Sequence, residues 1–172
     1  MYNTPPVEEK SWHFTDKTGW PQGRWLEEPD KIQWRDDGAG LPCLIVRGPS
    51  GALCGYVGVP ESHPYFGKDY GQCLDLKCDH EDWCHQRIDS EIGAHGGITF
   101  SGACSESEHG ICHVIEGDDK TWWFGFDCAH SGDLCPPRDR YAGDWYKDVD
   151  YVKSEIQSLA LQLARIKHEK VA

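Results

Sequence analysis

The clearest pattern of apolar positions lies near the C-terminus of the chain. Apolar residues there follow one another at spacings of three and four: Val149, Val152, Ile156, Leu159, Leu163 and Ile166. This spacing places side chains on one face of a helix, so it predicts a long amphipathic helix within residues 146–170. The apolar face of that helix either docks onto the protein's own sheet or forms a seam with a second copy of the chain.

Short apolar runs separated by turn residues predict β-strands upstream of this helix. Residues 42–47 (PCLIVR) and 53–59 (LCGYVGV) flank the turn sequence GPSG and are expected to form a hairpin. A short strand is expected at 98–100. Residues 111–115 (ICHVI) and 121–126 (TWWFGF) are joined by a Gly/Asp loop and predict a second hairpin. Because no helix-length segment separates these strands, their pairing should be mostly antiparallel.

These elements predict one globular domain in three parts, since 172 residues suffice for a single core. Residues 1–40 hold four of the eight tryptophans among prolines and charges, and are expected to form an irregular Trp-rich N-terminal arm. Residues 41–145 should form an antiparallel β core with acidic loops rich in Cys and His. The predicted fold is α+β, a mostly antiparallel sheet of short hairpins with extensive loops and one long C-terminal amphipathic helix.

The charge balance narrows the class of partner. The chain has 29 acidic and 17 basic residues, which gives a formal net charge of −12. A surface of this sign repels phosphates, so direct nucleic-acid binding is not expected. The charge either only keeps the protein soluble or suits the binding of cations or of a basic protein surface.

Apolar runs and cysteines indicate the compartment. No run approaches the roughly 20 apolar residues that a membrane span needs. The first ten residues lack the basic and apolar regions of a signal peptide, so a soluble cytoplasmic protein is expected. In that setting, nine cysteines indicate reduced thiols and no disulfide framework. These thiols are either buried side chains or metal ligands.

The segment 127–133 (DCAHSGD) is the first candidate for chemistry. It directly follows the apolar run TWWFGF, and side chains at a strand end can be both firmly held and exposed. Asp127, His130 and Asp133 recur at every third residue, which brings them near one face of a turn or short helix. A histidine with one or two carboxylates can ligate a divalent metal ion, or can act as a general base oriented by an acid.

The second candidate segment is His95-Gly96-Gly97, in which the glycines allow the backbone to approach a ligand closely. The structural alternative is that His95 sits in a tight turn and that Asp127 caps a helical turn. The candidate site residues fall into two groups. The catalytic candidates are His95, Asp127, His130 and Asp133, and the ligand-binding candidates are Trp34, His63, Gly96, Gly97, Trp122 and Trp123.

Cysteine and histidine gather in two further clusters. The candidate metal ligands are Cys78, His80, Cys84 and His85 in the first cluster, and Cys104, His109, Cys112 and His113 in the second. At this density they could hold structural zinc, or another divalent metal, in loops with little core of their own. The spacing departs from C-x2-C pairs, so scattered reduced thiols and solvent-facing histidines are the alternative. No nucleotide-cofactor motif is present, and Cys128 is expected to pack in the core.

Several of these segments together resemble a known group of proteins. The segments are DKIQW (30–34), GLPCLIVRGPSGALCGYVGVPESHP (40–64), HGGITF (95–100), ICHV (111–114) and WWFGFDCAHSGD (122–133). With them the chain resembles an uncharacterised family encoded by bacteriophages and by prophage-like regions of bacterial genomes, whose motifs are HGG(I/L)T(F/Y) and WWFGFDCAHxGD. The resemblance covers most of residues 28–166. It implies a cytoplasmic accessory protein in an infected cell, one that interferes with host enzymes or sequesters host signalling nucleotides.

Three functions remain open on the sequence. The first is a module that binds a small ligand or a metal ion at the His/Asp residues and counteracts host defence. The second is a metal-dependent hydrolase of a phosphate-containing or similar small substrate. The third is an acidic inhibitor that mimics nucleic acid and covers a basic surface of a host protein. The partner is accordingly a small molecule or a host protein, and a homodimer through the C-terminal helix is the alternative assembly.

Overall fold

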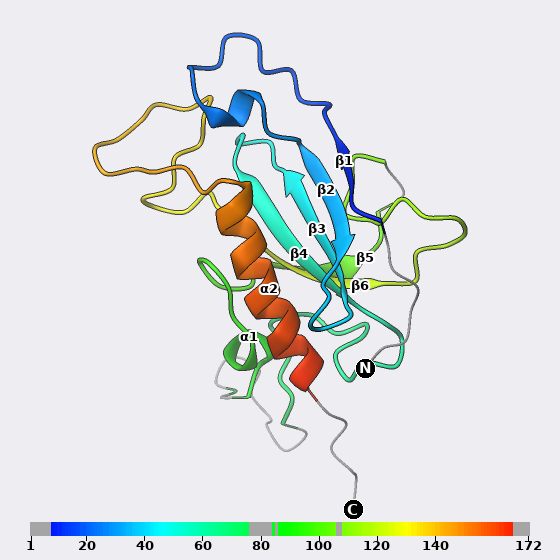
Figure 1. Cartoon of the computed structure of the whole chain (residues 1–172). Helices are drawn as coiled ribbons and strands as arrows, with labels where there is room; N and C mark the ends of the chain where they lie inside the picture. Colours follow the sequence, from blue (N-terminus) through cyan, green and yellow to red (C-terminus); the bar gives the residue numbers. More distant parts are fainter. Residues whose placement is uncertain (1–7, 76–83, 85, 106–107, 167–172) are drawn as a thin grey trace, which may run out of the picture.

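Six strands form one antiparallel sheet in the computed structural model, which describes residues 8–75, 84, 86–105 and 108–166. The strands are β1 Lys10–Trp12, β2 Lys31–Arg35, β3 Pro42–Arg47, β4 Leu53–Val59, β5 Phe100–Ala103 and β6 Trp122–Asp127. Their order across the sheet is β1-β2-β3-β4-β6-β5 (Figure 1). The helical segments are η1 Arg24–Leu26, α1 Ile88–Glu91 and α2 Val149–Arg165. The predicted α+β class, with a mostly antiparallel sheet and one long C-terminal helix, is confirmed.

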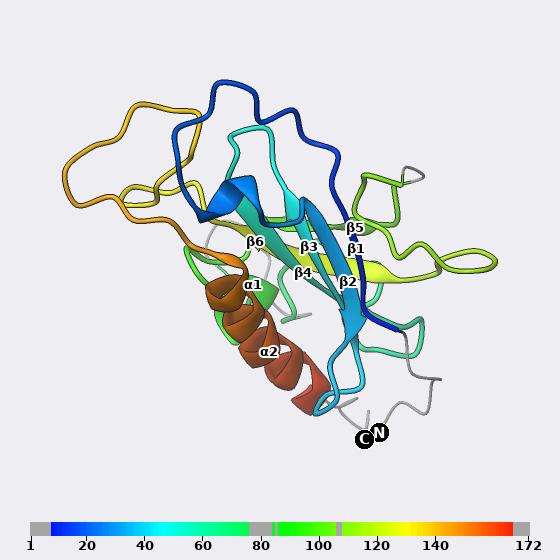
Figure 2. The same cartoon turned by 45° about the horizontal axis from the view of Figure 1, so that its top comes forward.

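Helix α2 covers one face of the sheet (Figures 1 and 2). It begins after Asp148, whose side chain accepts a hydrogen bond from the Tyr151 backbone N–H at 2.9 Å and so caps the helix. The inner positions of the predicted seam are fully buried in the core: Val152, Ile156, Leu159 and Leu163. The helix therefore docks onto its own sheet, and these seam residues are not exposed to a second copy of the chain.

The predicted hairpin of residues 111–115 with 121–126 is wrong. Strand β6 forms as expected, but it lies between β4 and β5, and Gly125 is the register partner of both Tyr56 and Phe100. Both edges of β6 are therefore occupied, and residues 111–115 form no strand. The short strand expected at 98–100 lies slightly later, at β5.

Residues 108–119 instead cover the other face of the sheet through side chains of β2. Lys31 Nζ donates to the carbonyl oxygens of Glu108 and Gly110, at 2.7 and 2.9 Å. The Gln33 amide pairs with both the N–H and the C=O of Val114. These bonds satisfy the backbone of the segment without a strand ladder.

The N-terminal arm is more regular than its sequence suggests. Residues 31–35, expected to be irregular, form β2 in the sheet, with β1 at its edge. The loop between β1 and β2 keeps the irregular character expected for the arm, and Trp25 is buried there with its Nε1 donating to the Pro21 carbonyl oxygen at 2.9 Å. Strands β3 and β4 pair as the predicted hairpin.

The cysteines differ from the expectation of reduced thiols. Disulfides join Cys73 to Cys84 and Cys104 to Cys112, whereas four of the described cysteines are free: Cys43, Cys54, Cys128 and Cys135. All four disulfide-bonded cysteines lie outside the six strands. Within the described residues, no helix has the length and apolar character needed to cross a membrane.

Candidate functional site

The loop after β6 is shaped by two aspartates. Asp127, the last residue of β6, accepts hydrogen bonds from the Ala129 N–H at 3.0 Å and from the Thr99 hydroxyl at 3.1 Å. Asp133 accepts a hydrogen bond from the His130 N–H at 3.0 Å. Both aspartates thus fold the backbone locally, as Asp does in turns, and hold the intervening histidine at the strand end.

Helix α2 holds the second candidate segment in place. Gln162 forms two hydrogen bonds with the backbone of Gly93, at 2.8 and 2.9 Å. Glu155 accepts a bond from the His95 N–H at 2.7 Å, and the Tyr151 hydroxyl lies 2.9 Å from His95 Nδ1. Tyr151, Glu155 and Gln162 are spaced by four and seven residues, so they lie on one face of the helix. This face fixes both the backbone and the ring of His95.

The four predicted catalytic residues come together in space. His95 Nε2 lies 2.8 Å from Asp133 Oδ2, although the two residues are 38 positions apart in the chain. The ring centroids of His95 and His130 are 5.8 Å apart, and His130 Nε2 lies 3.5 Å from Asp127 Oδ1. We call these four residues the candidate site. The loop that follows β6 and the glycine turn that carries His95 thus lie side by side.

Of the two glycines, only Gly96 is needed for the close approach of the His130 ring. Both have positive φ values, +68° and +91°. A Cβ atom at Gly96 would lie 2.2 Å from His130 Nε2, whereas one at Gly97 would meet no heavy atom within 4 Å. Gly96 therefore allows the His130 ring to lie directly against the backbone beside His95.

The charge on Asp133 orders the hydrogen bonds of the site. Burial would raise the pKa of Asp133, but bonds from His95, the His130 N–H and Lys147 outweigh it and hold the pKa below its usual value. Lys147 is itself buried, with Nζ 3.1 Å from Asp133 Oδ1 and 3.1 Å from the centroid of the Trp145 ring. Asp133 is thus an ionised acceptor, so His95 Nε2 donates to it.

The Asp133 bond also assigns the other ring nitrogen of His95. When His95 is neutral only one of its ring nitrogens carries a proton, and the bond to Asp133 assigns that proton to Nε2. Nδ1 is therefore the acceptor and the Tyr151 hydroxyl donates to it across 2.9 Å. Tyr151, His95 and Asp133 form a continuous relay of hydrogen bonds.

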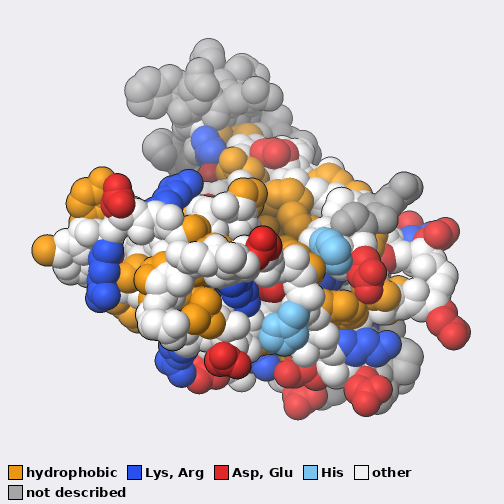
Figure 3. Space-filling view, turned by 90° about the horizontal axis from the view of Figure 1, so that it is seen from above, with side chains coloured by type: hydrophobic (Ala, Val, Ile, Leu, Met, Phe, Trp, Pro, Cys, Tyr) orange, Lys and Arg blue, Asp and Glu red, His pale blue; other side chains and the backbone are white. Residues whose placement is uncertain are grey.

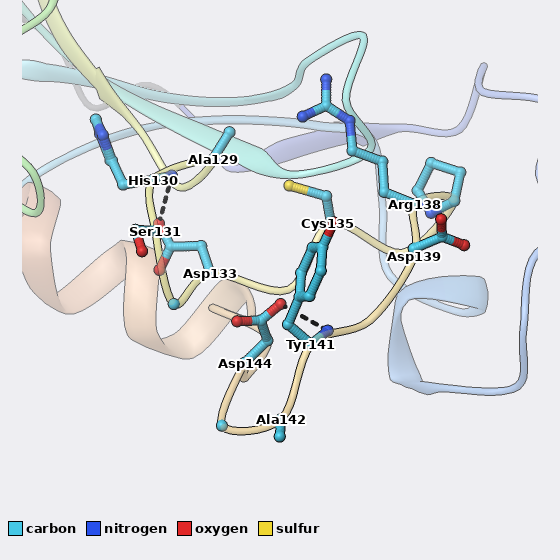
Figure 4. Close-up of a pocket in the computed structure, with 13 residues that line it drawn as sticks. Ala129, His130, Ser131, Asp133, Cys135, Arg138, Asp139, Tyr141, Ala142 and Asp144 are labelled. Atoms are coloured by element: carbon cyan, nitrogen blue, oxygen red, sulfur yellow. Dashed lines mark hydrogen bonds between the residues drawn. The ribbon is translucent and has the colours of Figure 1, made fainter.

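A polar pocket of about 960 Å³ adjoins the candidate site (Figure 4). Its walls are the loop that carries His130 and Asp133 and residues 137–139 and 141–144 of the following loop. Figure 4 shows the Arg138 and Tyr141 side chains across the pocket from His130. Tyr141 is 73% exposed, the most exposed of the large apolar side chains described.

The pocket loops lie beside the N-terminal end of α2, beyond one end of the sheet (Figures 1 and 2). Figure 3 looks onto this end and shows hydrophobic and basic side chains together on the part of the surface where these loops lie. The exposed members include Arg138, Arg140, Tyr141 and Trp145, together with the acidic Asp139. Basic and acidic side chains are thus mixed in these loops.

The other predicted ligand contacts lie away from the candidate site. Trp123 is fully buried in the sheet, and Trp122 stands at the start of β6, roughly 16 Å of strand from Asp127. His63 is buried with Nε2 2.9 Å from a backbone carbonyl oxygen of α2. Trp34 is half-buried on β2 beneath a lysine of α2. The structure thus groups only the two glycines of that set with the site.

Of the first Cys/His cluster, Cys78, His80 and His85 lie outside the described residues. Cys84 is described, and its sulfur is bonded to Cys73. The predicted zinc site at this cluster stays a prediction.

The second Cys/His cluster divides between a disulfide and two structural histidines. The sulfurs of Cys104 and Cys112 are bonded to each other, and with a carboxylate oxygen of Asp119 they lie within 4.8 Å of one another. A metal ion could use these three groups only after reduction of the disulfide. His113 Nε2 lies 2.8 Å from a buried carbonyl oxygen of β3, and His109 stacks on a phenylalanine. Zinc at this cluster also stays a prediction.

The sequence did not predict three residues that bond to His95 or Asp133 of the candidate site: Lys147, Tyr151 and Glu155. Hydrophobic periodicity marks the buried face of α2, and these polar residues lie before or beside that face. The signal that could have found them is a pair of polar side chains four residues apart, Tyr151 and Glu155, in the first half of an otherwise amphipathic helix.

In comparisons with known proteins, no family model, curated protein or solved structure matched the chain.

Proposed function

We propose that this protein binds a small phosphate-bearing ligand in the pocket beside the candidate site, with the His/Asp residues as acid–base groups. One observation carries the proposal: His130 and Asp133 line a single polar pocket, and directly behind them lie His95, bonded to Asp133, and Asp127, beside His130. Pockets with a few convergent polar groups are the usual sites of small-molecule binding.

Arg138 supports an anionic ligand. Within the described part of the chain, no carboxylate lies at ion-pair distance from it, whereas Arg24, Arg47 and Arg87 each have an acidic partner. Arg35, Arg140 and Arg165 also lack such a partner among the described residues, but of these four arginines only Arg138 lines the pocket. A guanidinium group presents paired N–H donors that match phosphate oxygens. The exposed ring of Tyr141, which also lines the pocket, offers a flat apolar surface of the kind on which a base stacks.

The hydrogen bonds argue for acid–base chemistry over a metal cage. Both ring nitrogens of His95 already have partners, and so do both carboxylate oxygens of Asp133. A metal ion at these atoms would have to replace bonds that hold the turn and the helix together. The metal-dependent hydrolase is therefore the weaker reading of the same residues.

The setting of this function follows from the sequence. The resemblance to phage-encoded proteins supports a cytoplasmic accessory role, in which the ligand is a nucleotide of the host cell and binding removes it from the host's use.

Isothermal titration calorimetry with inorganic phosphate and adenosine monophosphate tests the proposal. We expect both to bind, and Arg138→Ala to weaken binding about tenfold or more, because a charge-assisted hydrogen bond contributes roughly 1.5–3 kcal/mol. Arg140→Ala, an exposed arginine outside the pocket wall, is the matched control and should change affinity little. Failure of both probes to bind, or an equal loss in the two variants, would overturn the proposal.

Metal analysis of the purified protein tests the competing function, a metal-dependent hydrolase. Metal that co-purifies at one equivalent and is lost on His130→Ala would favour the hydrolase with a bound ion. Metal lost only on Cys112→Ala would instead indicate a structural site at the second Cys/His cluster.

A further inference from the structure

Tyr151 occupies a position that the proposed function does not yet use. It lies in the first turn of α2, half-buried, with its ring edge-on to His95 at 5.5 Å and to the exposed Trp145 at 5.3 Å. With His95 neutral and its proton on Nε2, the Tyr151 hydroxyl donates to Nδ1. The hydroxyl is thus one end of a relay whose other end is a buried carboxylate.

The order of this relay is that of a nucleophile, its base and an orienting acid. In such arrangements a hydroxyl gives its proton to an imidazole while its oxygen attacks, and a carboxylate stabilises the imidazolium that forms. Asp133 does this for His95 across 2.8 Å, and Lys147 holds the other carboxylate oxygen. The relay is assembled from a glycine turn, a strand-end loop and a helix.

The surroundings of Tyr151 disfavour its phenolate form, so its hydroxyl needs His95 as a base in order to react. Burial, followed by the nearby Glu155 carboxylate, raises the pKa of the Tyr151 hydroxyl. Free phenolate is therefore scarce at neutral pH, and attack requires proton transfer to His95.

The neighbouring thiol is a poorer nucleophile than the tyrosine. Cys128 is 2% exposed, and burial, followed by the nearby Asp133 carboxylate, raises its pKa well above the usual value for a thiol. A buried thiol without a base is inert, so Tyr151 is the better placed group.

We propose that Tyr151 is the nucleophile of this site and attacks the phosphorus of a bound phosphate ester. The phenol oxygen–phosphorus bond forms and the phosphorus–oxygen bond to the leaving alcohol breaks. The phenol proton passes to His95 Nδ1, which returns it to the departing alkoxide. A water molecule, deprotonated by His95, then hydrolyses the tyrosyl phosphate and restores the free hydroxyl. This step rests on the proposed function, since it needs a phosphate-bearing ligand in the pocket.

The test uses diisopropyl fluorophosphate, which forms the same bond and releases fluoride. Peptide mass spectrometry gives the labelling rates of Tyr151 and Tyr141 in the same wild-type sample at neutral pH. Tyr141 is the internal control, because it lines the pocket, is more exposed and has no histidine partner among the described residues. We expect Tyr151 to react about 100-fold faster, the lower range for general-base assistance.

A variant confirms the role of the base. His95→Gln should lower the Tyr151 rate to that of Tyr141 while the Tyr141 rate is unchanged, and circular dichroism checks that the variant is folded. Equal rates in the wild type, no labelling of Tyr151, or a rate that His95→Gln leaves unchanged would each overturn the proposal. The wild-type comparison decides the question even where the variant does not fold.

Phosphate titration separates this proposal from the function on which it rests. Tyr151→Phe should bind inorganic phosphate as the wild type does, because Arg138 remains in the pocket wall. If phosphate binds and Tyr151 is not labelled, the nucleophile is wrong and the binding function stands. If Tyr151 is labelled and phosphate does not bind, the relay is real and the ligand class is wrong.

Discussion

Two buried carboxylates, Asp30 and Asp133, organise two polar networks that differ in how they end. Asp30 is 1% exposed and accepts bonds from the Phe14 and Thr15 N–H groups at 2.9 and 3.0 Å. It also contacts Arg47 Nε at 2.6 Å and Lys17 Nζ at 3.0 Å. Every group in this network has its partner inside the protein, so the network ties the N-terminal arm to the sheet and offers nothing to a ligand.

The Asp133 network begins in the same way and ends differently. Its carboxylate is also buried and paired with a lysine, but the chain of bonds passes through His95 and ends at the Tyr151 hydroxyl, for which His95 is the one bonded group within the described residues. The Asp30 network passes through Arg47 to the Tyr146 hydroxyl, which is bonded on both sides, to Arg47 and to Glu28. A pocket adjoins the Asp133 network on one side. From this difference we expect the Asp30 network to serve stability and the Asp133 network to serve the proposed chemistry.

Removal of Asp30 should have the largest effect on stability. Asp30→Ala leaves the Arg47 guanidinium, whose side chain is fully buried, without its closest anionic partner. We expect a loss of about 3–5 kcal/mol in the free energy of unfolding, measured with urea. Glu9→Ala breaks an exposed pair with Lys153 and should cost less than about 1 kcal/mol. Similar losses in the two variants would contradict a closed structural network.

The fold was predictable where apolar residues follow a pattern along the chain. Val152, Ile156 and Leu159 mark α2 by their spacing, and the short apolar runs of β3 and β4 on either side of a turn mark a hairpin. Pairing was not predictable for β6, because neighbours in sequence are the default partners and both of its edges are taken by other strands. Residues 108–119 escaped prediction because the side chains of Lys31 and Gln33 satisfy their backbone.

The site was predictable only in part. Turn chemistry singles out Asp127, His130 and Asp133, and the glycine pair singles out His95. The position of His95 beside them depends on hydrogen bonds from α2, which is about 60 residues later in the chain. Contacts between such distant segments cannot be predicted from local sequence. For the same reason the role of Tyr151 became visible only in three dimensions.

Two adjacent glycines allow a more specific test of the candidate site. Gly96→Ala places a methyl group against His130 as well as in a left-handed conformation, so we expect a stability loss of about 3 kcal/mol. Gly97→Ala meets open space and should cost only about 1 kcal/mol. Calorimetry with phosphate should show weaker binding for Gly96→Ala alone. Equal binding by both variants would show that the position of His130 does not matter.

Acid should weaken the Asp30 network in a defined range. Burial alone would raise the pKa of Asp30, but its hydrogen bonds from Thr15, Phe14, Arg47 and Lys17 lower it to about 2. A folded pKa below the unfolded one, about 3.9, contributes stability that is complete above the unfolded value and is lost as pH falls toward the folded one. The full contribution is about 3 kcal/mol, and about 1 kcal/mol of it should be gone by pH 3.

Urea titrations of the wild type and of Asp30→Asn at pH 6 and pH 3 measure this contribution. The stability difference between the two proteins should shrink by about 1 kcal/mol at the lower pH. A difference that is constant across this range would mean that Asp30 titrates normally in the folded protein.

The smallest effect on stability is expected at the residue that we propose as the nucleophile. Tyr146 and Tyr151 are both half-buried, but the Tyr146 hydroxyl lies between Arg47 and Glu28, at 2.9 and 2.7 Å. Tyr146→Phe leaves two charged groups short of a partner and should cost about 1–3 kcal/mol. Tyr151→Phe leaves one uncharged acceptor, His95 Nδ1, short of a partner and should cost less than about 1 kcal/mol. If Tyr151→Phe destabilises the protein as much as Tyr146→Phe, its hydroxyl closes a structural network and the contrast between the two carboxylates fails.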